Sequence, residues 1–329
     1  MAAPGTRYPL IYIFSLPDNS KAETDFHDTS FFNSGQLPVP QLPTPAEIRQ
    51  QYLDRGARVI KFEHLNLIVK IGHPSQVRLE EAQTMRAIRQ AFPHHDVPVP
   101  EVFGWRTYQD QHFIYMSLLR GPTLRDEWPS LTETDKLSIC GELSCIVEAL
   151  RRITQASPDR FIGTSPSPCS VAVIKTLTSV LRSVNGRTMQ DRFFTDDHIG
   201  EPFLSIKSFN DFLLAAATRH PPETEISSEY QRLLYRDLLP DTGKNIYFTH
   251  GDLTLGNIIV SGIPGSQRIV DIVDWEQAGC YPEYWEYCKL LYEVEYDHEW
   301  RSAEWAEKVM ESFEDEWNVY MQYSSWRCP

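Results

Sequence analysis

Four polar residues in the last third of the chain have the types and spacing needed to transfer a phosphoryl group. His250, Asp252 and Asn257 lie close together, and Asp274 follows a short distance later. The spacing H-x-D-x-x-x-x-N is typical of a catalytic loop in which the Asp takes a substrate hydroxyl proton and the Asn binds magnesium. Taken singly, Asp252 could cap a helix and His250 could be a hydrogen-bonded core histidine. The complete set favours the catalytic interpretation.

A predicted β-hairpin would bring Asn257 and Asp274 together. Ile258–Val260 and Ile269–Val273 are β-branched runs separated by turn residues. If the runs pair, Asn257 precedes one strand and Asp274 follows the other at the same end. Asp271 is an alternative metal ligand, but side chains three apart on a strand point to opposite faces. The position at the strand end favours Asp274.

Three motifs around these residues resemble those of a known family. They are His-Gly-Asp-Leu-x-x-x-Asn-Ile-Ile-Val, Asp-Trp-Glu-x-Ala-Gly and Pro-x-x-Trp-Glu-Tyr. Together they resemble the aminoglycoside phosphotransferase family, and most of all its fungal members of unassigned substrate. The resemblance implies a two-lobed, protein-kinase-like α+β fold, with a small antiparallel-sheet N-lobe and a mainly helical C-lobe.

The same resemblance implies an ATP- and Mg²⁺-dependent kinase that phosphorylates a hydroxyl group of a small molecule. Asp252 would be the base or would orient that hydroxyl, while His250 would support the catalytic loop. Asn257 and Asp274 would bind the metal. No Ala-Pro-Glu motif follows Asp274, and no room remains for a long activation loop, which disfavours a protein substrate.

The first half of the chain contains a lysine and a glutamate that could hold nucleotide phosphates. Residues 57–71 predict two strands, and 78–92 predict a helix with an apolar stripe. Lys70 lies in the second strand, and Glu81 lies in the helix. Each of them could instead be an ordinary charged residue on the protein surface. The family resemblance implies that Lys70 grips the phosphates and that Glu81 fixes it, with Glu80 a close rival.

The chain lacks one feature of protein kinases. No G-x-G-x-x-G precedes Lys70, and the turn between the two strands contains no glycine. In protein kinases such a loop covers the phosphates with its N–H groups. Gly56 or the turn near His64 is the candidate replacement. The alternative is therefore a catalytically inactive, kinase-like protein that binds a nucleotide, a metabolite or another protein, although the complete Asp-Asn-Asp set opposes it.

Three regions are expected along the chain: an irregular lead-in (1–45), a nucleotide-binding N-lobe (46–117) and a helical C-lobe (118–329). The segment Met-Ser-x-x-x-Gly resembles the family's hinge, where backbone groups of Ser117 and Leu119 would bond the adenine edge. A second N-lobe hairpin is expected at 101–107 and 112–119. Helices are expected at 45–53, 132–153, 208–217, 230–239, 282–296 and 300–320.

The composition describes a globular, acidic protein. Hydrophobic residues make up 41% and aromatic residues 12% of the chain, enough for a folded core. The net charge of −14 argues against nucleic acid or an anionic membrane as partner. The six cysteines form no paired motif, so reduced thiols in a cytoplasmic protein are expected. The apolar stretch Tyr8–Leu16 is too short to span a bilayer and is interpreted as a strand or packing segment.

The final predicted helices are rich in acids. Thirteen acids lie between Glu276 and Trp317, against the three bases Lys289, Arg301 and Lys308. Such a run is usually a solvated helical face. The alternative is an acidic wall beside the acceptor cleft, which would attract a cationic substrate. On that alternative the small-molecule acceptor carries an amine as well as its hydroxyl.

Overall fold

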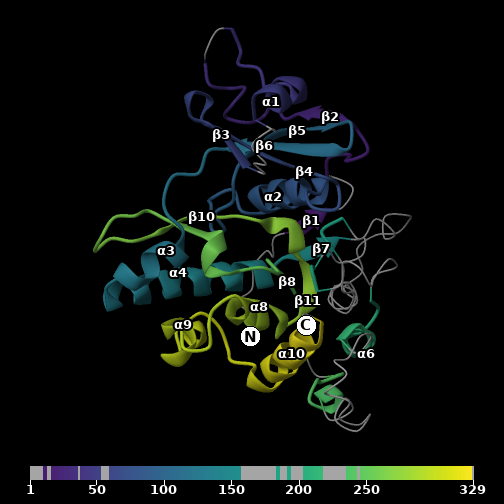
Figure 1. The fold of residues 1–329 in the computed structure, drawn as a ribbon, viewed down its shortest axis with the longest axis vertical. Helices are drawn as coiled ribbons and strands as arrows, with labels where there is room; N and C mark the ends of the chain where they lie inside the picture. The colour runs from purple at the N-terminus through teal and green to yellow at the C-terminus, as the bar shows by residue number, and fades with distance from the viewer. Residues whose placement is uncertain are drawn as a thin grey trace, which may run out of the picture.

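The chain folds into a sheet-containing lobe and a mainly helical lobe, and a linker of residues 118–123 leads from the first to the second (Figure 1). This computed structural model places the sheet with α1 and α2 in one lobe, and α4, α8, α9 and α10 in the other. No helix in the described part of the chain is long and apolar enough to cross a membrane. The structure describes residues 10–12, 16–35, 38–52, 59–156, 183–185, 191–193, 203–217, 235–242 and 245–327.

The N-lobe is built on a five-stranded antiparallel sheet. Both hairpins predicted from the sequence are present, β3 with β4 and β5 with β6. A 3-10 turn, η3 (Glu63–Leu65), joins β3 to β4 and ends at Asn66 in a left-handed conformation. In spatial order the strands are β2 (Glu23–Asp25), β5 (Val102–Tyr108), β6 (Gln111–Ser117), β4 (Leu67–Gly72) and β3 (Val59–Phe62).

Strand β2 lies in the segment that the sequence predicts to be irregular. Its residues Glu-Thr-Asp are polar and carry no strand pattern. The backbone of Thr24 nevertheless pairs with Trp105 on the open edge of β5, and Arg106 forms an ion pair with Asp25 at 2.7 Å. An edge strand needs a partner for its backbone groups more than it needs a particular side chain. Part of the lead-in therefore completes the sheet.

The two N-lobe helices cover opposite faces of this sheet. Helix α1 (Pro45–Tyr52) begins with the predicted capping box, since the Thr44 N–H donates to Glu47 at 2.8 Å and the Glu47 N–H donates back to Thr44. Helix α2 (Leu79–Ala91) buries its apolar stripe in the main core. Alternation along β4 puts Val69 on the α1 side and Lys70 on the other face, towards α2.

The C-lobe is mainly helical, and its long helix α4 starts at a capped threonine. The Thr132 side chain accepts a hydrogen bond from the Asp135 N–H at 3.1 Å. Strand β1 (Leu10–Tyr12) pairs in parallel with β7 (Thr154–Ala156), just after α4. In the described ranges, the remaining helices are α3 (Leu124–Glu127), η4 (Trp128–Ser130), α4 (Glu133–Arg151), α6 (Ile206–Ala217), η7 (Leu255–Asn257), η8 (Trp275–Gln277), α8 (Trp285–Tyr292), α9 (Glu299–Ser302), η9 (Ala306–Lys308) and α10 (Glu314–Arg327).

The C-terminal helices are shorter than the sequence predicts. The single helix expected at 300–320 is replaced by α9, η9 and α10. Glu304 has a φ of 54°, and a residue in this left-handed conformation cannot continue a right-handed helix. The helix expected at 282–296 is limited to α8 and follows a strand, β11 (Gly279–Pro282). The helix expected at 230–239 lies largely outside the described residues.

The hairpin predicted to bring Asn257 and Asp274 together is present. Strand β9 (Ile258–Val260) pairs antiparallel with β10 (Ile269–Ile272), with an irregularity between Ile269 and Asp271. Gly121 in the linker lies against this hairpin, since a Cβ there would be 2.1 Å from the Val260 carbonyl oxygen. Beside the hairpin, β8 (Ile246–Thr249) pairs with β11 and leads into the catalytic loop.

Candidate active site

The loop after β8 holds His250 as a single neutral tautomer. Its imidazole is buried, with Nε2 2.9 Å from the Val273 carbonyl oxygen and Nδ1 3.1 Å from the Asp252 N–H. Nε2 must therefore donate and Nδ1 must accept. Burial lowers the pKa of His250 to about 4, so the ring is neutral near pH 7. Both nitrogens bind backbone, and His250 fixes the loop to the end of β10.

Gly251 and Glu286 shape the same loop. Gly251 has a φ of +76°, and a Cβ there would lie 2.5 Å from the Gln277 carbonyl oxygen, so glycine alone fits. Glu286 on α8 is buried and accepts the His250 N–H at 2.6 Å. Burial raises the pKa of Glu286 to about 7 against the opposing backbone N–H groups. Glu286 therefore anchors the loop and does not belong to an exposed acidic wall.

Asp252 and Asn257 are joined directly. The Asn257 side-chain amide donates to the Asp252 carbonyl oxygen at 2.8 Å and to Asp252 Oδ2 at 3.1 Å. Asp252 Oδ1 and Asn257 Oδ1 have no hydrogen-bond partner among the residues that the structure describes. Burial raises the pKa of Asp252 to about 6, with Lys289 as the main opposing charge. This buried, oriented carboxylate has the increased proton affinity that suits a general base.

The two aspartates at the end of the hairpin face different surroundings. The Val273 N–H donates to the Asn257 carbonyl oxygen at 2.9 Å, which brings Asn257 beside the residue that precedes Asp274. The Asp274 carboxylate lies 2.7 Å from Lys70 Nζ. Asp271 instead lines a separate cavity between the lobes. The two side chains therefore lie apart as predicted, but strand alternation does not reach Asp274, which follows the end of β10 in a left-handed conformation.

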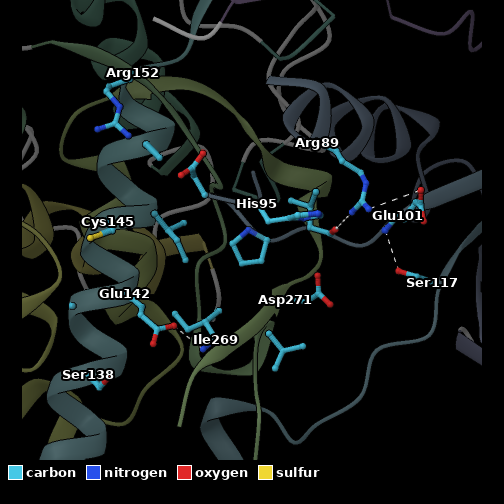
Figure 2. Close-up of a pocket in the computed structure, with 17 residues that line it drawn as sticks. Arg89, His95, Glu101, Ser117, Ser138, Glu142, Cys145, Arg152, Ile269 and Asp271 are labelled. Carbon is cyan, nitrogen blue, oxygen red and sulfur yellow. Dashed lines mark hydrogen bonds and ion pairs between the residues drawn. The ribbon is translucent and has the colours of Figure 1, made fainter. Parts of the chain in front are cut away.

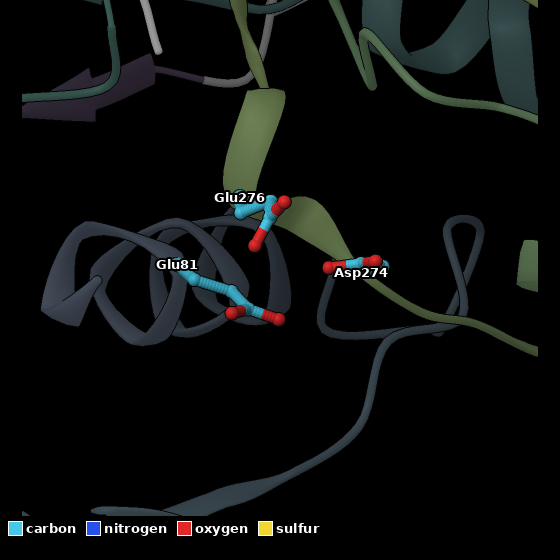
Figure 3. Close-up of side chains that lie close together, drawn as sticks. All are labelled: Glu81, Asp274 and Glu276. Atoms are coloured by element: carbon cyan, nitrogen blue, oxygen red, sulfur yellow. The ribbon is translucent and has the colours of Figure 1, made fainter. Parts of the chain in front are cut away.

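Three carboxylates surround the ammonium group of Lys70. Its Nζ lies 2.8 Å from Glu81, 2.7 Å from Asp274 and 3.5 Å from Glu276. In Figure 3, Glu81 projects from helix α2, and Asp274 and Glu276 project from the segment after β10. The three acids have oxygens within 4.8 Å of one another and are of the kind that binds a hard cation. The N-lobe and the catalytic hairpin therefore meet at one charged cluster.

Charge in this cluster is only partly balanced. Burial opposes the charge on Lys70, but Glu81 and Asp274 outweigh it and raise the pKa of Lys70. Burial also works against ionised Asp274, but Lys70 outweighs it and lowers the pKa of that carboxyl. Burial raises the pKa of Glu81 to about 7 despite the attraction of Lys70. Lys70 and Arg192 together face three acids, which leaves one negative charge that a bound cation would neutralise.

The backbone groups expected at the adenine site differ in availability. The Ser117 N–H donates to the Glu101 carbonyl oxygen at 2.9 Å, and the Leu118 N–H donates to Asn66 at 3.0 Å. In the described part of the protein, no acceptor binds the Leu119 N–H. Leu119 thus offers a free donor, whereas Ser117 has only its carbonyl group to offer. Gly56, a candidate for covering the phosphates, lies outside the described residues.

The sequence matches a family model described as "Phosphotransferase enzyme family" over residues 47–323. The chain belongs to this phosphotransferase family. The predicted fold is confirmed as the two-lobed, protein-kinase-like α+β arrangement, with an antiparallel-sheet lobe and a mainly helical lobe. No curated protein matches the sequence.

Several solved structures are similar to this phosphotransferase. One is aminoglycoside phosphotransferase APH(3'')-Id from Streptomyces rimosus in complex with ADP and streptomycin, at 17% identity, with 86% of this chain and 98% of that chain covered and a TM-score of 0.47. Another is the streptomycin-ATP-APH(2'')-IIa ternary complex, at 15% identity, with 87% and 89% covered and a TM-score of 0.46. A third is aminoglycoside-3'-phosphotransferase of type VIII, at 13% identity, with 79% and 84% covered and a TM-score of 0.45.

Sequence reasoning missed three charged residues at the phosphotransferase site. Arg192 lies 2.5 Å from Glu276 and 3.6 Å from Asp274, but its surrounding segment has no recognisable pattern. Glu276 could have been found, because it stands two residues after Asp274 in the Asp-Trp-Glu motif. Lys289 is buried on α8 and binds Gln277 at 3.1 Å. A helical lysine in an acidic run gives no sign of such burial.

Replacing Lys70 with Met is expected to destabilise the phosphotransferase and to make its stability depend on divalent cations. The substitution leaves three neighbouring carboxylates without their ammonium partner, at a cost of about 3 kcal/mol. Magnesium or calcium should recover part of this loss by binding between the acids. Urea unfolding with and without each cation measures both effects.

Lys61→Met is the matched control for this substitution, because Lys61 lies on neighbouring β3 with its side chain exposed. It should change the unfolding free energy little. The conclusion that the three acids form a cation-binding cluster would be contradicted by either of two results. One is an equal loss of unfolding free energy in the two variants, and the other is a loss in Lys70→Met that no cation reduces.

Proposed function

We propose that this protein is an ATP- and Mg²⁺-dependent kinase that phosphorylates a hydroxyl group of a small molecule. The observation that carries the proposal is the buried Asp252 carboxylate, held by Asn257 through one oxygen and open at the other. That open oxygen would accept the hydroxyl proton of the acceptor as its oxygen attacks the γ-phosphorus. The resulting phosphate ester and ADP are the products.

The residues near Asp252 fit a magnesium ion. Asn257 Oδ1 has no hydrogen-bond partner among the described residues, and the Asp274 carboxylate belongs to a cluster with excess negative charge. Amide and carboxylate oxygens are ligands that Mg²⁺ accepts. We assign Asn257 and Asp274 as the metal-binding residues. When bound, the metal would neutralise charge on the transferred phosphoryl group.

The nucleotide would lie between the lobes, with Lys70 at its phosphates and Leu119 at its base. Lys70 is oriented by the buried Glu81, and its long side chain can exchange the Asp274 carboxylate for a phosphate oxygen. The open Leu119 N–H would donate to adenine, and the Ser117 carbonyl would accept from it. This division of roles is supported by the hydrogen bonds that already occupy the neighbouring N–H groups.

The acceptor is proposed to be a small molecule that carries an amine. Only η8 (Trp275–Gln277) and β11 separate Asp274 from α8, so no long activation loop follows the metal-binding residue. Glu293 is exposed, forms an ion pair with Arg125 at 2.5 Å, and is close enough to contribute to the raised pKa of Asp252. Asp297, a few residues later, is also exposed. These two acids would attract a cationic acceptor. We also propose a cytoplasmic location, because the six cysteines of the sequence form no paired motif.

Transfer of labelled γ-phosphate from ATP to a panel of hydroxylated amines and matched neutral alcohols tests the proposal. We expect Mg²⁺-dependent transfer, with a lower KM for the cationic acceptor at low salt. That advantage should shrink at higher ionic strength, because exposed charges are screened beyond about 10 Å at 0.1 M salt. Saturable ATP binding with no transfer to any acceptor would instead favour the inactive, nucleotide-binding alternative.

Variants that neutralise these two acids test whether the protein recognises the acceptor's positive charge, separately from whether it transfers phosphate. Glu293→Gln and Asp297→Asn should each raise KM for the cationic acceptor and leave KM for the neutral one unchanged. Glu23→Gln, on the exposed edge strand β2 of the N-lobe, is the control. If the cationic and neutral acceptors respond alike to salt and to these variants, the acceptor carries no recognised amine, while the kinase activity stands.

A further inference from the structure

A cavity of about 850 Å³ lies between the lobes and contains neither Asp252 nor Asp274 (Figure 2). Its walls come from the C-terminal end of α2, the connector to β5, one face of α4 and strand β10. This volume is within the range of small-molecule sites in proteins. In Figure 2, Asp271 points into this space from β10, with Arg89 and Glu101 on one side and Arg152 and Cys145 on the other.

Four polar residues around this cavity already have partners. Glu142 accepts the Ile269 N–H at 2.9 Å, and Ser117 Oγ accepts the Glu101 N–H at 3.0 Å. Arg89 donates to the Val99 carbonyl oxygen at 3.4 Å and lies 3.9 Å from Glu101. These contacts hold the walls in place without filling the space between them.

Asp271 differs from the other half-buried acids of the cavity wall, Glu101 and Glu142. Its half-buried carboxylate has no hydrogen bond or ion pair with any residue in the described ranges. Burial raises the pKa of Asp271 to about 6, with Arg89 as the opposing charge, so the group is still mostly ionised near pH 7. A half-buried carboxylate without a partner is costly, and a cation is the partner that would relieve it.

The cavity also has an apolar wall beside this carboxylate. Val99, Ile146 and Ile269 line it, together with Pro98 and Ala149. An organic ammonium group with a short hydrocarbon or aromatic body would satisfy both features. A bare metal ion would leave the apolar wall unused, and an anion would face Asp271.

We propose that this cavity is a second ligand site, which binds a small organic amine through the Asp271 carboxylate. It lacks the catalytic, phosphate and metal residues assigned above, and it meets the proposed nucleotide site at Ser117, which borders the cavity. The bound ammonium donates to Asp271, and the body of the amine packs on the apolar wall between α4 and β10.

The position of the site couples its occupant to the catalytic hairpin. Asp271 stands three residues before Asp274 on one continuous segment, and the Ile272 N–H donates to the Pro98 carbonyl oxygen at 3.1 Å. An amine there touches both lobes at the strand that positions Asp274. This coupling rests on the proposed function. If present, it is reciprocal, so bound Mg-ATP and bound amine change each other's affinity by the same factor.

The binding test uses 2-phenylethylamine, with 2-phenylethanol as its uncharged counterpart. Cys145 is exposed on the cavity wall, and its reaction with a fluorescent maleimide reports occupancy. The amine should slow labelling in a saturable way, and calorimetry should give the same affinity, whereas the alcohol should not protect. The signal assigned to Cys145 is the part absent from Cys145→Ser. None of these measurements requires phosphoryl transfer, so they can succeed even if the protein proves inactive as a kinase.

Two variants identify the site. Asp271→Asn should weaken amine binding about tenfold or more through loss of the charge-assisted hydrogen bond. Asp96→Asn, at an exposed position of the same cavity, should change it far less. Gly141→Leu on α4 should block the cavity without unfolding the protein, because a Cβ at Gly141 meets nothing within 4 Å and leucine favours helix.

Three outcomes would overturn the proposal. The first is no saturable binding of 2-phenylethylamine at millimolar concentration. The second is equal protection by the amine and the alcohol. The third is unchanged amine affinity in both Asp271→Asn and Gly141→Leu. Because Gly141→Leu retains the carboxylate, it keeps the proposal testable if Asp271→Asn fails to fold.

Discussion

Asp252→Asn is expected to lower kcat for phosphoryl transfer by about a thousandfold and to leave the fold intact. Asparagine keeps the shape of the side chain and an oxygen that can accept from the Asn257 amide, now 3.1 Å from Asp252 Oδ2. It can neither take a proton from the acceptor nor supply negative charge beside it. Steady-state kinetics with the best acceptor from the panel measures the loss.

The control for this variant is Asp110→Asn, at an exposed turn position between β5 and β6. It removes the same charge from the protein without touching the catalytic loop, and it should keep wild-type turnover. Circular dichroism and thermal melting of both variants exclude unfolding as the cause. Near wild-type kcat in Asp252→Asn would remove Asp252 from the role of base and leave the reaction without an identified proton acceptor.

Asp274→Asn should weaken Mg-ATP binding by about a hundredfold, and far more than Asp271→Asn does. Both substitutions replace an aspartate near the end of β10 with its neutral amide. Only Asp274 is in contact with Lys70 and the acid cluster, whereas Asp271 faces the cavity behind the hairpin. Isothermal titration of Mg-ATP into the two variants compares them directly.

The reverse order would show that the wrong aspartate has been assigned to the metal. Titration of ATP without magnesium is the necessary control, because loss of Asp274 also frees Lys70 to bind phosphate. A variant that loses affinity only in the presence of magnesium identifies a metal ligand. A variant that loses it equally without magnesium identifies a change in the position of Lys70.

The catalytic loop was the most predictable part of the structure. Local spacing placed Asp252 and Asn257 together, and two β-branched runs with turn residues between them specified the hairpin. Asp274 and Asp271 also lie apart as expected, although Asp274 follows the end of β10 in a left-handed conformation. Each of these inferences depends on residues close in sequence, where backbone geometry leaves few choices.

Long-range contacts set the limits of sequence reasoning. Glu286 reads as one acid in an acidic run, yet it is buried because the His250 N–H needs an acceptor. Arg192 reaches Glu276 from a distant segment with no helical or strand pattern of its own. Strand β2 forms because β5 offers an open edge, and nothing in Glu-Thr-Asp predicts that. In all three cases the partner decides the structure, and the partner lies far away in the sequence.

At position 274, the residue that would best stabilise the backbone differs from the residue that the proposed activity needs. The φ of 64° and ψ of 57° at Asp274 belong to the left-handed region, which costs most side chains about 1–2 kcal/mol relative to glycine. Aspartate tolerates this region better than most residues, but glycine would suit the turn best. Glycine would also delete the carboxylate that we assign to the metal. Engineering that rewards thermal tolerance alone would therefore favour sequences in which this hairpin folds more readily and the kinase no longer works.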